Sequence, residues 1–297
     1  MYLQKVTGPI LLGLFLSGLL EHFIPREYIS AVMAPSKKRT ILYSVGLGFL
    51  SSACSCGVLA LSIQLYKKGA STSAVMAFLL ASPWASMPLT FLLIGFFGWI
   101  KAFYIVLSAV VIALTTGRIF QILERRGLVE RNEKTLAIGK DFSIFQDIRK
   151  RYARYQFSIK AISSDIQGVL RGAWALGDMI LWWILIGMAL ASLAGAYIPA
   201  EIFRQYLGPT ALGLGMTLVT ATLMEVCSEG SSPFAFEIFR QTGALGNSFI
   251  FLMGGVVTDY TEIGLLWHNV GKKTAVLLPL VTIPQVILFG VLGNMIF

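Results

Sequence analysis

Eight long apolar segments constrain the fold of this chain more than any other feature. Each could cross a hydrocarbon core of about 30 Å as a helix of about 20 residues. Hydrophobic residues make up 56% of the 297 residues and charged residues 13%, against about 25% charged in a typical soluble domain. The sequence therefore predicts an all-α polytopic membrane protein. The segments are Thr7–Ile24, Ile41–Tyr66, Ser71–Phe97, Ala102–Ile122, Trp174–Tyr197, Ala211–Phe239, Ala244–His268 and Ala275–Ile296.

Four of these segments, the second, third, sixth and seventh, are overlong and interrupted near their middles. The interruptions read "CSCG", "SPWASMP", "CSEGSSP" and "GGVVTD". Unpaired backbone N–H and C=O groups are costly in lipid, so broken helices survive only where they line an enclosed or wet cavity. The interruptions therefore predict helices broken near the membrane midplane around a solute site, as in secondary transporters.

One long polar stretch separates the fourth and fifth segments. Residues 121–171 contain 11 Lys or Arg against 6 Asp or Glu, which places this loop on the cytoplasmic side of the plasma membrane. With an even number of crossings on either side, both termini would also be cytoplasmic, but the basic residues at 36–39 and 272–273 would lie outside. A re-entrant hairpin in place of one crossing would reverse those assignments.

The second half of the chain repeats features of the first. The matches at a shift of 173 are Cys54, Ser55 and Gly57 with Cys227, Ser228 and Gly230. At a shift of 174, "IPRE" meets "IPAE", Gly69 meets Gly243, and "SPWA" meets "VVTD". Such matches, in order and at nearly constant offset, predict two related four-segment halves. We expect a first membrane repeat at 1–122, a basic cytoplasmic linker at 123–171 and a second membrane repeat at 172–297.

The interruptions supply the candidate substrate-binding residues. Glycine lets the backbone turn, serine can bond freed carbonyls, and thiols are soft ligands. These candidates are Cys54, Ser55, Cys56, Gly57, Cys227, Ser228 and Gly230. The alternative is that the cysteines only pack, since Cys behaves as a small hydrophobe and small residues are common where membrane helices touch.

Carboxylates in the sixth and seventh segments are candidates for proton coupling. Glu225 and Glu229 are four residues apart and share a face of any continuous helix, and Asp259 lies in the seventh segment. Ionisable groups inside a span are expensive and point to function. The alternative is that Glu229 or Asp259 caps the start of a half-helix. Glu237 and Glu262 are expected near the membrane interface.

The order of these motifs resembles a known family. "CSCG", followed by "GASTSAVMAFLLASPWAS" and a second glycine-broken segment, is similar to the predicted-permease family that includes the ArsP organoarsenical efflux permeases. The resemblance implies export of trivalent organoarsenicals, with the family's cysteine motif at Cys54 and Cys56 and its Ser-Pro break at Ser82 and Pro83. Trivalent arsenic is thiophilic, and protonation of a thiolate by a nearby acid would release it, as in a proton antiport cycle.

Three functions stay open from the sequence. The first is an efflux permease for a thiol-reactive solute, and the second is a permease or channel for an unrelated solute. The third, a thiol redox enzyme in the membrane, is least favoured, because the two histidines, His22 and His268, lie at segment ends and no cofactor motif is evident. We therefore expect a transporter without cofactor, metal or catalytic residues. Its expected partners are a small-molecule substrate and membrane lipid but not nucleic acid, and a homo-oligomer is left open.

Overall fold

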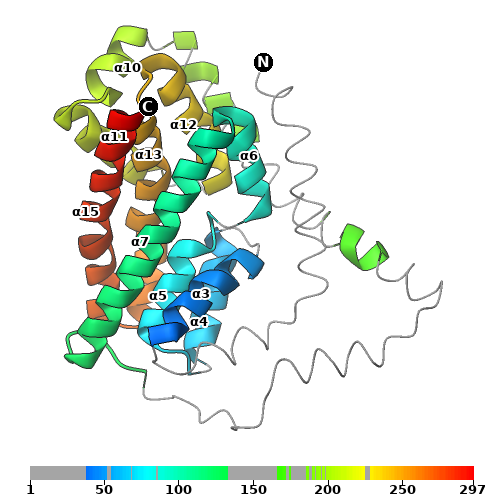
Figure 1. The fold of residues 1–297 in the computed structure, drawn as a ribbon, viewed down its shortest axis with the longest axis vertical. Helices are drawn as coiled ribbons and strands as arrows, with labels where there is room; N and C mark the ends of the chain where they lie inside the picture. The colour runs from blue at the N-terminus through cyan, green and yellow to red at the C-terminus, as the bar shows by residue number, and fades with distance from the viewer. Residues whose placement is uncertain are drawn as a thin grey trace.

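The computed structural model describes residues 38–51, 55–67, 69–84, 86–132, 199–224 and 228–297, with 166–171 and isolated positions between 174 and 197. Every regular element within these residues is a helix, which confirms the all-α prediction. The longer helices (Figure 1) are α3 (Lys38–Ser51), α4 (Ser55–Lys67), α5 (Thr72–Ala81), α6 (Met87–Phe97), α7 (Trp99–Arg125), α10 (Ala200–Leu207), α11 (Ala211–Met224), α12 (Ser228–Thr242), α13 (Leu245–Thr258), α14 (Tyr260–Asn269) and α15 (Lys272–Ile296).

Three stretches of the described residues are long and apolar enough to cross a membrane: Trp99–Arg125, Leu245–Asn269 and Lys272–Ile296. A fourth is possible if α10 and α11, which meet at 93°, form one span. The described residues thus give three or four of the eight predicted crossings. The first predicted segment and most of the fifth lie outside them. The second, third and sixth segments are each divided between two shorter helices.

In the first half, the outer ends of α3 and α4 lie at the same end of the molecule. Gly117 of α7 lies against Ile41 near the start of α3. Asn132, which follows α7, donates hydrogen bonds to the carbonyl of Tyr66 (2.5 Å), in the last turn of α4, and to that of Ala70 (2.9 Å), just after α4. Both helices therefore begin or end near the C-terminal end of α7, and their inner ends point towards the middle.

In the second half, α11 and α12 are arranged in the same way at the opposite end of the molecule. Asn247 in α13 donates to the carbonyl of Gly208, just before α11, at 2.9 Å. At the inner end of α11, the hydroxyls of Thr222 and Thr258 are 2.7 Å apart. Figure 1 shows α3, α4 and α5 in the lower half of the molecule and α10, α11 and α12 in the upper half.

The long helices α7 and α15 pack antiparallel and join the two halves. Near the start of α7, Tyr104 donates to the Phe289 carbonyl at 2.6 Å, and its ring lies 5.5 Å from that of Phe297. Beyond the other end of α7, Glu130 accepts from the backbone N–H of Thr274 at 3.0 Å. The C-terminus therefore lies at the end opposite Arg125, so the prediction of a C-terminus on the linker's side is wrong. Within the described residues, α3 and α4 have their outer ends at one end of the molecule and α11 and α12 have theirs at the other, so neither pair of helices carries the chain from one end to the other.

The helix boundaries recur along the chain. The starts of α3, α4, α5, α6 and α7 each precede those of α11, α12, α13, α14 and α15 by 173 residues. The packing recurs too: α3 with α5 and α11 with α13, α5 with α7 and α13 with α15, and across the halves α6 with α12 and α14 with α4. The same shift pairs the N-cap residues Ser86 and Asp259. The predicted match of "SPWA" to "VVTD" was therefore out of register by one residue.

The outer surface and the interior differ as expected for a protein in lipid. All ten residues of α5 are buried. Large apolar side chains are exposed along α7 and α15, among them Phe103 (68%), Leu280 (62%) and Met295 (78%). Without competing water, such side chains are stable against lipid tails, and the helical backbone satisfies its own hydrogen bonds.

Candidate functional site: the helix breaks

The break between α5 and α6 is built by serine and proline. The Ser82 backbone N–H and hydroxyl both donate to the Phe78 carbonyl, at 3.0 and 2.8 Å, and complete α5. Pro83 follows, and proline lacks the N–H that would continue the helix. Trp84 and Ser86 are fully buried in this break. Ser86 is the N-cap of α6, but its side chain makes no capping hydrogen bond.

The break between α13 and α14 is the equivalent position in the second half. There an acidic residue, Asp259, caps the start of α14. Asp259 accepts a hydrogen bond from the backbone N–H of Glu262 at 2.9 Å, as expected of an N-cap residue. The hydroxyl of Thr258, the last residue of α13, donates to the Gly254 carbonyl at 2.8 Å. Glu262 is buried, with 6% of its surface exposed. Of the two roles predicted for Asp259, proton coupling or capping of a half-helix, the hydrogen bond from Glu262 is the one expected of a cap.

The start of α12 is a buried polar turn. Glu229 is fully buried, and the Ser228 hydroxyl donates to its carboxylate at 3.1 Å. The hydroxyls of Ser231 and Ser232 donate back to the Ser228 carbonyl, at 3.1 and 2.8 Å. Pro233 lies inside the helix and removes the N–H that would bond the Glu229 carbonyl four residues earlier. This turn is therefore polar and irregular although it is enclosed by protein.

Small residues let the hairpins approach the breaks closely. A Cβ at Gly48 of α3 would lie 3.1 Å from the Ser82 hydroxyl oxygen and 3.2 Å from the Ala81 Cβ. In the second half, a Cβ at Gly254 of α13 would lie 2.7 Å from the Leu218 side chain of α11. Such contacts are typical of membrane helices that pack backbone to backbone. They hold the inner ends of α3 and α11 against the ends of α5 and α13.

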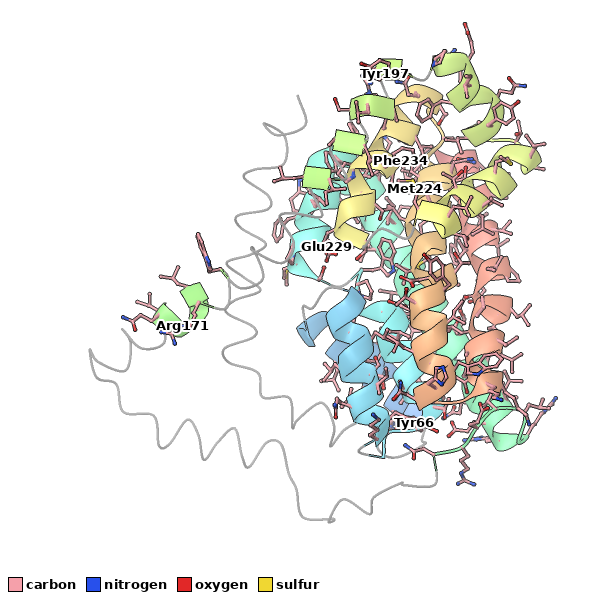
Figure 2. The ribbon with its side chains drawn as sticks, turned by 180° about the vertical axis from the view of Figure 1, so that it is seen from behind. Tyr66, Arg171, Tyr197, Met224, Glu229 and Phe234 are labelled. Carbon is pink, nitrogen blue, oxygen red and sulfur yellow. The ribbon has the colours of Figure 1, made fainter. Side chains whose placement is uncertain are left out.

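The second halves of α6 and α12 lie side by side. There the rings of Phe96 and Phe236 stack at 5.1 Å, and those of Phe97 and Phe239 approach to 5.7 Å. Nine residues separate Phe96 from the start of α6 and eight separate Phe236 from the start of α12, which is about 13 and 12 Å of helix. Figure 2 places Glu229 between Tyr66 near one end of the molecule and Tyr197 near the other.

The predicted site residues are distributed unevenly over the described part of the chain. Ser82 and Pro83 lie at the α5–α6 break, Ser228, Glu229 and Gly230 form the first turn of α12, and Asp259 caps α14. Ser55, Cys56 and Gly57 form the first turn of α4, but their side chains are not described. Cys54, Glu225 and Cys227 lie outside the described residues. The assignment of Cys54, Cys56 and Cys227 to the substrate site therefore stays a prediction.

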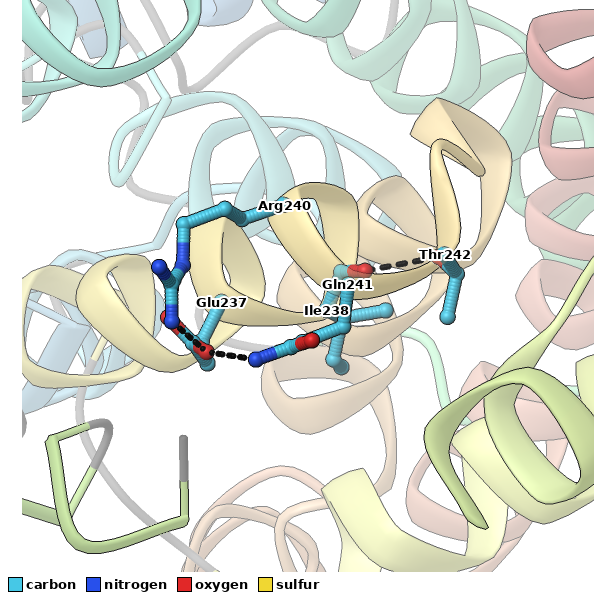
Figure 3. Close-up of polar contacts among 5 residues, drawn as sticks. All are labelled: Glu237, Ile238, Arg240, Gln241 and Thr242. Atoms are coloured by element: carbon cyan, nitrogen blue, oxygen red, sulfur yellow. Dashed lines mark hydrogen bonds and ion pairs between the residues drawn. The ribbon is translucent and has the colours of Figure 1, made fainter. Parts of the chain in front are cut away.

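A buried ion pair near the outer end of α12 was missed by sequence analysis. Glu237 is fully buried, and its carboxylate accepts from Arg240 Nη2 at 2.6 Å and Nε at 2.9 Å, and from Gln241 Nε2 at 2.7 Å (Figure 3). The spacing of three and four residues places these groups on one helix face. The same spacing is visible in the sequence and could have predicted the ion pair. No three His, Cys, Asp or Glu side chains cluster as a metal site in the described residues.

Comparison with known proteins agrees with this arrangement of broken apolar helices. The sequence model of a family described as a predicted permease, ArsP_1, matches residues 2–295. The chain belongs to this predicted permease family. The resemblance inferred from "CSCG" and "SPWAS" is thereby confirmed at the level of the family. No solved structure matches the chain significantly.

Three relatives of this permease family member cover between 79% and 95% of its length. It is 25% identical over 293 residues to the UPF0718 protein YcgR of Bacillus subtilis, covering 95% of this chain and 90% of that protein. It is 19% identical over 270 residues to a candidate two-component membrane permease complex subunit of Streptococcus mutans, covering 90% and 84%. A candidate permease of Mycobacterium tuberculosis, Rv2963, is 22% identical over 249 residues, covering 79% and 60%.

Proposed function

We propose that this protein is a secondary transporter that exports a small thiol-reactive solute, with trivalent organoarsenicals as the first candidates. The observation that carries the proposal is the pair of helical hairpins, α3–α4 and α11–α12, which enter from opposite ends and turn back in the middle. Broken helices at mid-depth are tolerated in a bilayer only around an enclosed or wet cavity. In secondary transporters they hold the substrate.

The two halves would be an inverted repeat. Helix bounds at a constant shift of 173 support a duplication, and the antiparallel packing of α7 against α15 supports the inversion. An inverted repeat gives two conformations of similar energy, because each half can adopt the arrangement of the other. Such a pair of states is what alternating access requires.

The charge distribution supports an orientation in the plasma membrane. Of the basic residues in the described part of the chain, most lie at the end of the molecule where α3 begins, α4 and α7 end and α15 begins. They include Arg39, Lys67, Arg125, Arg126, Arg131, Lys272 and Lys273. The opposite end has Lys101, Arg204 and Arg240. By the positive-inside rule the first end, with the linker, is cytoplasmic. In that orientation Arg39, Lys272 and Lys273 would lie on the cytoplasmic side, in agreement with the rule.

The thiols would bind the cargo. Cys54 adjoins the start of α4 and Cys227 adjoins the start of α12, at equivalent positions of the two halves. Thiolates are the soft ligands that a trivalent arsenic centre prefers. Glu229 is fully buried and follows Cys227 by two residues in the chain, and we assign to it the exchange of a proton with that thiol. Glu225 and Asp259 are the alternatives for this role.

The test is uptake of methylarsenite and of inorganic arsenite into everted vesicles. We expect the unaltered protein to accumulate the organic form. We expect uptake by the double variant Cys54→Ser, Cys56→Ser to fall at least about tenfold, because a hydroxyl group cannot replace a thiolate as a soft ligand. Cys227→Ser is the matched single-thiol variant, and Ser108→Ala, a buried hydroxyl of α7, is the control. Equal uptake by wild type and double variant would reject the thiol site and favour a permease for another solute.

A further inference from the structure

Two buried hydrogen-bond donors at the α5–α6 break have no partner. The indole Nε1–H of Trp84 and the hydroxyl of Ser86 make no hydrogen bond within the described structure, and both residues have 0% of their surface exposed. A buried polar group without a partner costs about 1–3 kcal/mol, and native proteins retain few of them. Two of them within three residues of one another point to a ligand that completes the site.

The surrounding backbone fixes the chemistry of that ligand. Ser86 is the N-cap of the eleven-residue helix α6, and no acidic residue occupies the first turn of α6. A helix start carries partial positive charge. The indole N–H only donates hydrogen bonds. The site therefore offers donors and positive potential, which suits an acceptor that carries negative charge.

The second half shows what occupies the equivalent position when the chain fills it itself. Asp259 stands 173 residues after Ser86 and is the N-cap of α14. Its carboxylate oxygen accepts from the Glu262 backbone N–H at 2.9 Å. In α6 the same position holds a neutral hydroxyl that does not cap. An anionic oxygen at the start of α6 would take the place that the Asp259 carboxylate takes at the start of α14.

We propose that an anionic oxygen of the transported solute binds at the start of α6, where it accepts hydrogen bonds from Trp84 Nε1 and Ser86 Oγ. This rests on the proposed transport function and assigns its substrate class: a small solute that carries an oxyanion. The start of α12, with buried Glu229 and Ser228, belongs to the helix whose Phe236 ring stacks on the Phe96 ring of α6. The thiols and the oxyanion subsite would then hold two parts of one solute.

Calorimetric titration of the purified full chain in detergent tests the subsite. The probes are four anions, acetate, sulfate, phosphate and methylarsonate, with neutral methylarsenite for comparison. We expect at least one anion to bind saturably. We expect Ser86→Asp, which installs the acid of the second half, to weaken that binding about tenfold or more, because it fills the subsite and repels the anion. Trp84→Phe removes one donor and should weaken it similarly.

One control variant and the chemistry of the Ser86→Asp change keep the test decisive. Trp99→Phe makes the same chemical change at a side chain that is 72% exposed at the start of α7, and it should leave binding unchanged. Aspartate is a favourable N-cap residue, so Ser86→Asp should keep the start of α6 intact. If this variant elutes as a folded protein, its loss of anion binding cannot be ascribed to unfolding. If none of the four anions binds, or if Ser86→Asp binds within twofold of wild type, the subsite is rejected.

The failure of this proposal can be told from failure of the transport proposal. Thiol-dependent methylarsenite uptake that is unchanged in Ser86→Asp, without anion binding, would reject the subsite and leave the permease. Anion binding that depends on Ser86, without movement of any arsenical, would reject the organoarsenical cargo and support the subsite.

Discussion

Glu130 provides a quantitative test of how the two halves are joined. It lies five residues after α7 and accepts hydrogen bonds at the start of α15 from Lys273 N (2.9 Å), Thr274 N (3.0 Å) and Thr274 Oγ1 (2.8 Å). Loss of a capping group costs roughly 0.5–2 kcal/mol, and loss of a charge at a helix start roughly 0.3–1 kcal/mol. We therefore expect Glu130→Ala to destabilise the protein by about 1–3 kcal/mol.

The assay is thermal unfolding of the detergent-purified protein, followed by tryptophan fluorescence. Glu130→Ala should lower the apparent midpoint by several degrees, and Glu130→Gln, which keeps an acceptor but loses the charge, by less. Glu201→Ala, an exposed acid in the first turn of α10, is the matched control. If Glu130→Ala unfolds within a degree of wild type, the cap does not join the halves as described.

The pH dependence of the same variants has a definite sign. Burial alone would raise the pKa of Glu130, but the hydrogen bonds from Lys273 and Thr274 outweigh it and hold that pKa below its usual range. A lowered folded-state pKa gives stability above the unfolded pKa that is lost as pH falls through the folded value. The difference between wild type and Glu130→Gln should therefore be full near neutral pH and shrink in acid. A difference that grows in acid would contradict the reasoning.

Two further predictions concern packing, and both are checked by the same unfolding assay and by expression level. Gly117→Ala in α7 should destabilise by about 1–3 kcal/mol, because its Cβ would lie 2.7 Å from the Ala77 Cβ. The control Gly46→Ala, with nothing within 4 Å, should be neutral or slightly stabilising; equal effects would contradict the close packing. Phe236→Ala removes the ring that stacks on α6 at 5.1 Å and should cost about 3–5 kcal/mol, while Phe103→Ala, 68% exposed, should cost far less. A small effect of Phe236→Ala would argue against the side-by-side placement of α6 and α12.

The sequence was sufficient for the all-helical class and for two of the helix ends. Apolar length and the lack of charge predict membrane helices because lipid offers no hydrogen bonds to the backbone. Pro83 interrupts a helix wherever it occurs, and Asp259 followed by Glu262 predicts a helix start. These are local effects, and the structure has α5 ending at Ala81 and α14 beginning at Tyr260.

The path of the hairpins could not be read from hydropathy. A segment such as Ile41–Tyr66 is long enough to cross, and its apolar content is the same whether it crosses or turns back. The contacts that decide between them are tertiary: Asn132 with the Tyr66 carbonyl, and Gly117 with Ile41. The unpartnered donors of Trp84 and Ser86 were hidden for the same reason, because a missing partner is a property of the folded chain.

Labelling from the two sides of the membrane tests the central architecture most directly. In a variant with Cys54, Cys56 and Cys227 replaced by Ser, single cysteines are introduced by Arg126→Cys, beyond α7, and Phe297→Cys, at the C-terminus. Each is reacted with a membrane-impermeant maleimide in intact cells and in everted vesicles. The two inverted hairpins predict opposite sides: Arg126→Cys labelled only in everted vesicles and Phe297→Cys only in intact cells. Labelling of both from the same side would mean that the hairpin segments cross the membrane, and it would contradict the structure at its centre.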